Sequence, residues 1–209
     1  MTTSSTRFRA LAPLALLAIV AAALAVSVST AGARTNVASV AYRLTATLTP
    51  TQVVPAVSAP AGASGQFHGI LIRSGTNAAK VAKLAGCTVI TAPRRSGLPT
   101  KINCGGAPVT LPGTAGQWRL VWHLSYSHLS GPVTGAAIHI APAGHSAAAL
   151  TKICSPCAPV SHGSMGVTSD QATQMTGNAS YVDVSTAAHP DGEIRGQIVR
   201  TTIGYVIGR

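Results

Sequence analysis

The chain has 209 residues and a formal net charge of +11 at pH 7, because 15 Lys and Arg face only four acidic side chains. Such a charge attracts anionic envelope polymers, lipid head groups or nucleic acid. The basic residues form no run with interleaved aromatics, which argues against nucleic acid. The chain has few acids that could form a catalytic carboxylate pair, since three of the four lie in one short segment near the C-terminus. This argues against hydrolysis by paired carboxylates.

Residues 1–33 have the form of a secretory signal. Arg7 and Arg9 precede an apolar run from Leu11 to Val28, and Ala31–Ala33 offers small residues for cleavage. The run has 18 residues, close to the length that spans a bilayer, so an uncleaved N-terminal anchor is the alternative. We expect an extracytoplasmic protein, secreted or associated with the cell envelope, that meets a membrane only through this segment.

A β domain is expected over residues 42–209, after a linker at 34–41. Tyr42 to Leu48 alternates with period two, as a strand with one buried face does. The predicted buried side consists of Tyr42, Leu44, Ala46 and Leu48. After a loop rich in Pro, Ala and Gly, Gln66 to Ser74 is predicted to form a second strand.

Residues 75–116 are the least patterned part of the chain. They have too few apolar residues for a core of their own, so we interpret them as a variable insert within the domain. The segment holds Cys87 and Cys104. It also holds much of the positive charge, at Lys80, Lys83, Arg94, Arg95 and Lys101.

The clearest strand is Gln117 to Tyr126. Its predicted core face consists of Trp118, Leu120, Trp122, Leu124 and Tyr126. Gly135–Ile140 and Gly163–Val167 are predicted to be shorter strands. Ser169 to Gly177 favours one short helix, with Ser169 as its cap.

Two strands close the domain, Tyr181–Ser185 and Glu193–Arg200, around turn residues at His189–Gly192. Many short strands, Gly/Pro turns and little helix predict an all-β fold. We expect an antiparallel β-sandwich or a Greek-key-like barrel, with one short helix and a disulfide-stapled insert.

The closing hairpin also carries three charged side chains, Asp183, Glu193 and Arg195. If its register places Ser185 opposite Glu193, then Asp183 falls opposite Arg195, and a cross-strand carboxylate–guanidinium bridge results. We interpret these three residues as a structural motif and not as a reacting centre.

Four cysteines in an exported chain are most simply read as two disulfides, for which three pairings are possible. The sequence-local pairing joins Cys87 to Cys104 and Cys154 to Cys157. The spacing of Cys154 and Cys157 also suggests a redox or zinc motif. Ala158-Pro159 follows at once, however, and argues against the helix that a redox motif normally begins.

Several segments resemble the CHRD domain, a module named from chordin that is common in exported bacterial proteins. They are Leu44–Pro55, Ala61–Gly65, Leu120–Val133, Ala136–Ile140 and, most closely, Gly177–Gln197 with its Gly-Glu-Ile-Arg-Gly-Gln ending. The resemblance implies an all-β sandwich. It implies no established activity, although animal members bind secreted growth factors.

The resemblance also bears on metal binding. Members typically carry a His-x-His and a His-Thr, from which a copper or zinc site could be assembled. Here the aligned residues are Ala137-Ile-His139 and Ser185-Thr186, so only His139 remains as a weak candidate ligand. The other histidines look scattered along the chain: His68, His123, His128, His145, His162 and His189. We therefore expect no metal and no other cofactor.

No enzyme signature stands out, and the leading hypothesis is a non-catalytic exported module that binds or scaffolds something at the envelope or outside the cell. Its expected partners are anionic envelope polymers or an extracellular protein. One alternative is a copper- or zinc-binding protein that uses His139 with His123 or His189. Another is a thiol oxidoreductase that acts through Cys154 and Cys157.

Overall fold

The computed structural model describes residues 39–75, 78–91, 100–111 and 116–206. The predicted signal at 1–33 lies outside these residues, as do Arg94 and Arg95 of the insert. No helix in the described part is both long and apolar enough to cross a membrane.

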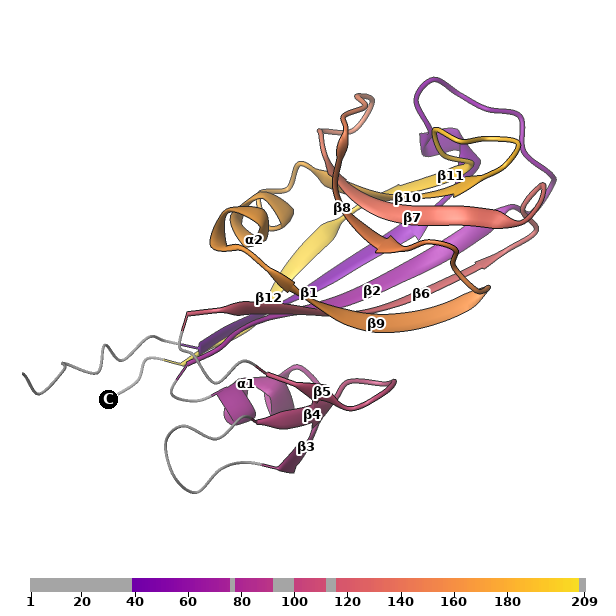
Figure 1. The fold of residues 1–209 in the computed structure, drawn as a ribbon. Coiled ribbons are helices and arrows are strands. Elements are labelled where there is room, and N and C mark those ends of the chain that lie inside the picture. Colours follow the sequence, from indigo (N-terminus) through magenta and orange to yellow (C-terminus); the bar gives the residue numbers. More distant parts are fainter. Residues whose placement is uncertain (1–38, 76–77, 92–99, 112–115, 207–209) are drawn as a thin grey trace, which may run out of the picture. The chain divides into compact units, whose positions relative to one another are not determined.

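Five antiparallel strands form what we call the large sheet, in the order β12-β1-β2-β6-β9 (Figure 1). The strands are β1 (Ser39–Leu48), β2 (Ser64–Arg73), β6 (Trp118–Ser127), β9 (Val160–Val167) and β12 (Val199–Val206). β2 and β6 pair along their whole length, from Ser64 opposite Ser127 to Arg73 opposite Trp118. The three long strands predicted from the sequence are therefore confirmed, and they lie side by side.

Four strands form the small sheet, in the order β11-β10-β7-β8. They are β7 (Val133–Ile140), β8 (Ala149–Cys154), β10 (Ser180–Thr186) and β11 (Ile194–Gln197). β8 was not predicted, because it is an edge strand in which only Ile153 is buried and the apolar alternation is missing.

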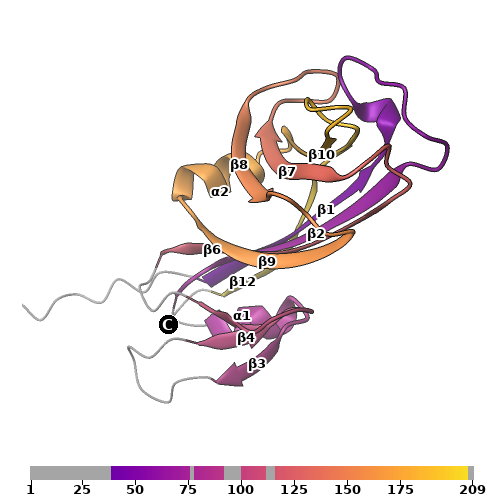
Figure 2. The ribbon, with the colours of Figure 1, turned by 45° about the vertical axis from the view of Figure 1, so that its right-hand side comes forward.

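The two sheets pack face to face and enclose the main core, so the fold is a sandwich, and within the described residues neither sheet closes into a barrel (Figure 2). The alternation predicted for β1 and β6 is confirmed. Among the fully buried core side chains are Leu44, Leu48, Phe67, Leu71, Leu120, Leu124, Ile138, Val182, Val184 and Ile194. Each such Leu, Ile or Phe stabilises the fold by roughly 1.5–3 kcal/mol relative to an exposed side chain.

The insert has more structure than its sequence pattern indicates. It contains α1 (Ala78–Leu84), β3 (Thr88–Thr91), β4 (Lys101–Asn103) and β5 (Val109–Thr110), and these three strands form a third sheet. The described residues therefore include two short α-helices, where one was expected.

The core of the insert is shared with the large sheet. Ala41, Ile72 and Val121 project from the large sheet's outward face and pack with apolar residues of the insert. The insert partners are Val81, Ala82, Ala85, Cys87, Ile102, Val109 and Leu111. In both ribbon views α1 and β3–β5 lie on the side of the large sheet that faces away from the small sheet (Figure 2). This shared core explains how a segment with few apolar residues forms ordered elements.

A second short helix, α2 (Ser169–Met175), connects β9 to β10. Its cap is Thr168 and not the predicted Ser169. The Thr168 side chain accepts a hydrogen bond from the Gln171 backbone N–H, while the Gln171 side chain accepts one from the Thr168 N–H. Such a capping box satisfies two otherwise unpaired donors, which moves the helix start by one residue.

The last predicted strand, Glu193–Arg200, is divided between the two sheets. β11 pairs with β10 in the small sheet, whereas β12 pairs with β1 in the large sheet. The change occurs at Ile198, which is 3% exposed in the core and donates its backbone N–H to Ser180 O. Burial of Ile198 between the sheets thus overrides the continuous extended pattern.

Candidate functional site

The outward face of the small sheet carries a polar cluster that we call the His139 cluster: His139, Tyr181, Asp183 and Arg195. Tyr181 is the direct cross-strand partner of His139, and Asp183 is that of Arg195. The sequence-derived register is therefore correct. Although these side chains point away from the core, Tyr181 is only 3% exposed, because residues of the β7–β8 loop fold over the sheet.

Aromatic contacts hold the His139 cluster together. The His139 ring stacks on the Tyr181 ring with centroids 4.6 Å apart. From the strand on the other side of β10, the Arg195 guanidinium carbon lies 3.5 Å from the centroid of the same ring. The Tyr181 hydroxyl donates to Ala147 O and accepts from Ala147 N–H in the covering loop. Cation–π and stacking contacts of this kind stabilise a buried cluster by roughly 0.5–2 kcal/mol each.

The predicted ion pair between Asp183 and Arg195 is wrong. Asp183 Oδ2 instead lies 3.0 Å from His139 Nε2. Arg195 donates from Nη2 to Pro142 O at 3.4 Å while it covers the Tyr181 ring. The guanidinium is drawn over the aromatic ring, and the imidazole of the neighbouring strand takes its place beside the carboxylate.

His139 is a candidate for pH-linked stability. Burial lowers the pKa of an imidazole, but the Asp183 carboxylate, the Ala147 carbonyl at 2.9 Å from Nδ1 and the Ala148 backbone together raise the pKa of His139 above its ordinary value. Protonated His139 thus has the Ala147 carbonyl beside Nδ1 and an ion-pair partner, Asp183, close to Nε2.

We predict that replacing His139 by glutamine destabilises the domain more at acidic than at alkaline pH. A pKa raised by folding contributes stability that is complete below the unfolded-state pKa, about 6.5, and that is lost as pH rises through the folded-state pKa. Denaturant unfolding of the wild type and His139→Gln between about pH 5 and pH 9 measures this difference. A difference that grows with rising pH would contradict the assignment, and exposed His145→Gln serves as the control.

An open cavity of about 620 Å³ adjoins the His139 cluster. Its polar lining includes His139, Lys152, Tyr181, Asp183, Ser185 and Asp191. Two further hydroxyls of the lining donate to backbone carbonyls: Ser146 to Val54 O at 2.6 Å and Ser155 to Thr134 O at 3.0 Å. Both serine hydroxyls are thus engaged with the backbone.

Glu193 binds the closing hairpin to the turn after β6. Its side chain has an exposed fraction of 0%. It accepts hydrogen bonds from Ser130 N–H at 2.7 Å, Ser130 Oγ at 2.7 Å and Thr186 Oγ1 at 2.6 Å. Burial alone raises the pKa of a carboxyl, but these hydrogen bonds outweigh burial and lower the pKa of Glu193. The residue holds a buried charge in a structural position.

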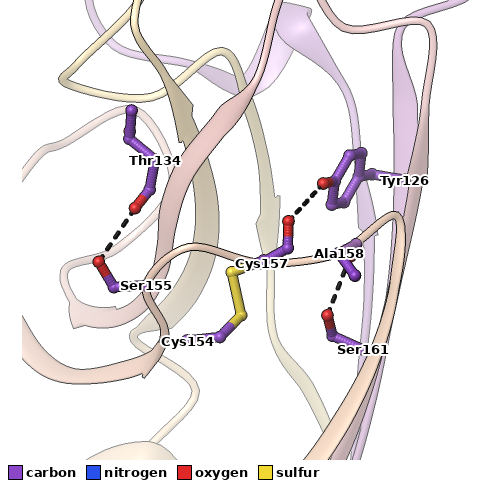
Figure 3. The surroundings of a disulfide bond; sticks show 7 residues. All are labelled: Tyr126, Thr134, Cys154, Ser155, Cys157, Ala158 and Ser161. Atoms are coloured by element: carbon purple, nitrogen blue, oxygen red, sulfur yellow. Dashed lines mark hydrogen bonds between the residues drawn. A yellow bond between two sulfur atoms is a disulfide. The ribbon is translucent and has the colours of Figure 1, made fainter.

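Each disulfide joins two cysteines that follow one another among the cysteines of the chain, Cys87 with Cys104 and Cys154 with Cys157. Figure 3 shows the second disulfide in the connection from β8 to β9, where the Tyr126 hydroxyl donates to Cys157 O at 2.8 Å. Cys157 is buried in the main core, and the chain continues to a strand and not to a helix. The helix N-terminus that would activate a thiolate is thus missing at this position.

The charges of the domain are separated between its layers. All four acids of the chain follow residue 169, in α2, β10 and the β10–β11 turn. The outward face of the large sheet and the insert carry what we call the cationic layer, made of Arg43, Lys80, Lys83, Lys101 and Arg119. Four of these five side chains are exposed, Arg119 being half-buried. Since the acids lie on α2, β10 and the β10–β11 turn, the cations of this layer contribute a positive field on the large-sheet side.

The histidines are less scattered than the sequence indicates. His123 lies on the outward face of the large sheet and His139 on that of the small sheet, so the proposed pairing of these two as metal ligands is wrong. His68, His123 and His162 are, by contrast, successive cross-strand neighbours. Across the described ranges, no three His, Cys, Asp or Glu side chains are grouped so that they could hold a metal ion.

A family model for the CHRD domain matches residues 44–198. The chain belongs to the CHRD domain family. The match begins within β1, includes the insert, and ends at Ile198, where the chain changes sheet. No curated protein and no solved structure matches the chain.

The Gly-Glu-Ile-Arg-Gly-Gln segment, Gly192 to Gln197, packs the two sheets together. Gly196 lies against β1, where a Cβ would come within 2.5 Å of Thr47 O. Arg195 exchanges backbone hydrogen bonds with Thr49, at 2.9 and 3.1 Å. The Gln197 side chain donates to Ala141 O, and the Gln197 backbone N–H donates to Gln52 Oε1. The motif therefore maintains the sandwich, and its residues are occupied by structural contacts.

Proposed function

We propose that this CHRD-domain protein is an exported, non-catalytic module that binds anionic envelope polymers through the cationic layer. The observation that carries the proposal is the separation of charge, with five cations on one face and every acid of the chain on other elements. An extended polyanion can contact many of these cations at once. Each cation attracts it only weakly, but the attractions add up.

Two further features support a binding role. In the cavity of the small sheet, Asp183 is paired with His139, and Ser146 and Ser155 donate to backbone carbonyls. The two disulfides are typical of proteins that work in an oxidising, extracytoplasmic compartment.

The proposal is tested by the affinity of the purified protein for isolated anionic wall polymer over a salt titration. We expect binding that weakens steeply as ionic strength rises, since exposed charges are screened. Replacing Lys80, Lys83 and Lys101 by glutamine is expected to weaken binding about tenfold, at roughly 0.5 kcal/mol per exposed charge.

A matched pair of single variants locates the surface. Lys101 and Lys152 are both exposed strand lysines, one in the insert and the other in the small sheet. Lys101→Gln should weaken binding about two- to threefold and Lys152→Gln should leave it unchanged. Equal effects of the two, or no binding at any salt concentration, would overturn the proposal. Preference for anionic vesicles or nucleic acid over the polymer would also overturn it.

A further inference from the structure

Three histidines form a continuous row across the outward face of the large sheet, which we call the histidine row. His123 on β6 lies directly opposite His68 on β2 and, on its other side, directly opposite His162 on β9. Cross-strand partners have Cα atoms about 4.5–5.5 Å apart. The three imidazoles therefore follow one another at right angles to the strands.

The row faces solvent beside the cationic layer. His68 and His162 are exposed and His123 is half-buried. At one end the insert adjoins it, since a Cβ on Gly106 would meet the His162 ring at 2.8 Å. At the other end Thr45 of β1 lies opposite His68.

No carboxylate offsets charge on the row. Along the same face, the charged groups are Arg43 on β1 and Arg119 on β6, and the insert adds Lys80, Lys83 and Lys101. The facing residues of β12 and β9 are uncharged, Val199 and Thr201 on the first and Ser164 and Val160 on the second. The β4–β5 loop, Cys104 to Pro108, has no ionisable side chain, since Cys104 is disulfide-bonded.

This setting couples protonation of the row to binding of an anion. Histidine is the side chain that ordinarily gains charge between about pH 8 and pH 5. Like charges directly opposite each other on neighbouring strands repel. A polyanion that lies along the row removes this repulsion, so its binding favours the protonated imidazoles. By linkage, protonation of the imidazoles must then tighten the binding.

We propose that the histidine row is part of the polyanion-binding surface and makes binding tighter as the pH falls. This inference rests on the function proposed above and adds its regulation. The ligand is a polymer whose anionic groups reach across three strands. An acidic environment strengthens its attachment, and a neutral one weakens it.

The test uses a sulfated polysaccharide such as dextran sulfate, whose sulfate esters stay ionised throughout the range studied, so only the protein titrates. The wild type is expected to bind about tenfold more tightly at about pH 5.5 than at about pH 7.5, which corresponds to a modest linkage at each of three sites. Calorimetry in two buffers of different ionisation enthalpy should also detect proton uptake on binding.

The decisive variant is His68→Gln/His123→Gln/His162→Gln, with folding checked by circular dichroism. It should lose the pH dependence and the proton uptake while keeping the salt-sensitive binding seen at about pH 7.5. The control is His128→Asn/His145→Gln, which removes two exposed histidines outside the row and should keep the tenfold ratio.

The outcomes separate this inference from the proposed function. A triple variant that keeps the pH ratio, or a wild type that binds equally at both pH values, overturns the role of the row and leaves the proposed function standing. A wild type that shows no salt-sensitive binding at either pH overturns the proposed function itself.

Discussion

Gly196→Ala is expected to lower the free energy of unfolding by about 3 kcal/mol, the upper range for forcing an extra methyl group into a packed interior. The added Cβ would lie 2.5 Å from Thr47 O and 3.1 Å from the Ala46 Cβ. Neither neighbour can move aside easily, because Ala46 and Thr47 are both paired with β2, and β1 is held to Arg195 by the two backbone hydrogen bonds of Thr49. Urea or guanidinium unfolding followed by circular dichroism measures the loss.

Gly166→Ala is the matched control for this prediction. Gly166 is also a strand glycine, on β9, but an added Cβ there would meet nothing within 4 Å. We expect its effect on unfolding to stay within about 0.5 kcal/mol. If the two variants were equally stable, β11 would not be held against β1 as described.

Glu193→Ala is also expected to lower the free energy of unfolding substantially, by about 3 kcal/mol. The substitution removes the acceptor of three hydrogen bonds, two from Ser130 and one from the hydroxyl of Thr186, which is fully buried. Glu193→Gln keeps the shape and one acceptor oxygen, so its cost should be smaller, about 1–2 kcal/mol. Chemical unfolding at neutral pH gives both values.

The pH dependence of the Glu193 effect gives a second check. A carboxyl pKa lowered by folding contributes stability above its unfolded-state value, about 4.3, and this stability is lost as pH falls through the folded-state pKa. The cost of Glu193→Ala should therefore shrink on acidification. Exposed Asp191→Ala removes the same charge two residues away and should have little effect at any pH. A comparable loss in both variants would mean that net charge, and not the buried contacts, is responsible.

The sandwich could be predicted because its long strands alternate strictly. In β1 and β6 every second side chain is apolar and reaches the core, which is what a half-buried strand requires. The register that was assumed for the closing hairpin is also the observed one, with Asp183 opposite Arg195. The disulfides agree with the simplest sequence-local pairing.

The structure of the insert and the partner of Asp183 could not be predicted, because both depend on contacts between distant segments. The insert is ordered by Ile72 and Val121, which belong to strands on either side of it in the sequence. Asp183 meets His139 only because Arg195 is drawn onto Tyr181. The pattern of residues along a single segment indicates neither the packing of the insert nor the partner of Asp183.

The histidine row was missed for a related reason. His68 and His123 each stood at an outward position of a predicted strand, which was the available signal. Their alignment, and that of His162, depends on which strands pair and in what register. Spacing along the chain cannot supply that information.

The measurement that tests the central claim most directly is mapping of the polymer contact by backbone amide chemical shifts. The labelled protein is titrated with dextran sulfate at low salt, and each shifting amide is assigned to a layer. The account predicts shifts along α1, at Lys101 and at His68 and His123, with those of His139 and Asp183 unchanged. Shifts confined to the small sheet and its cavity would contradict it.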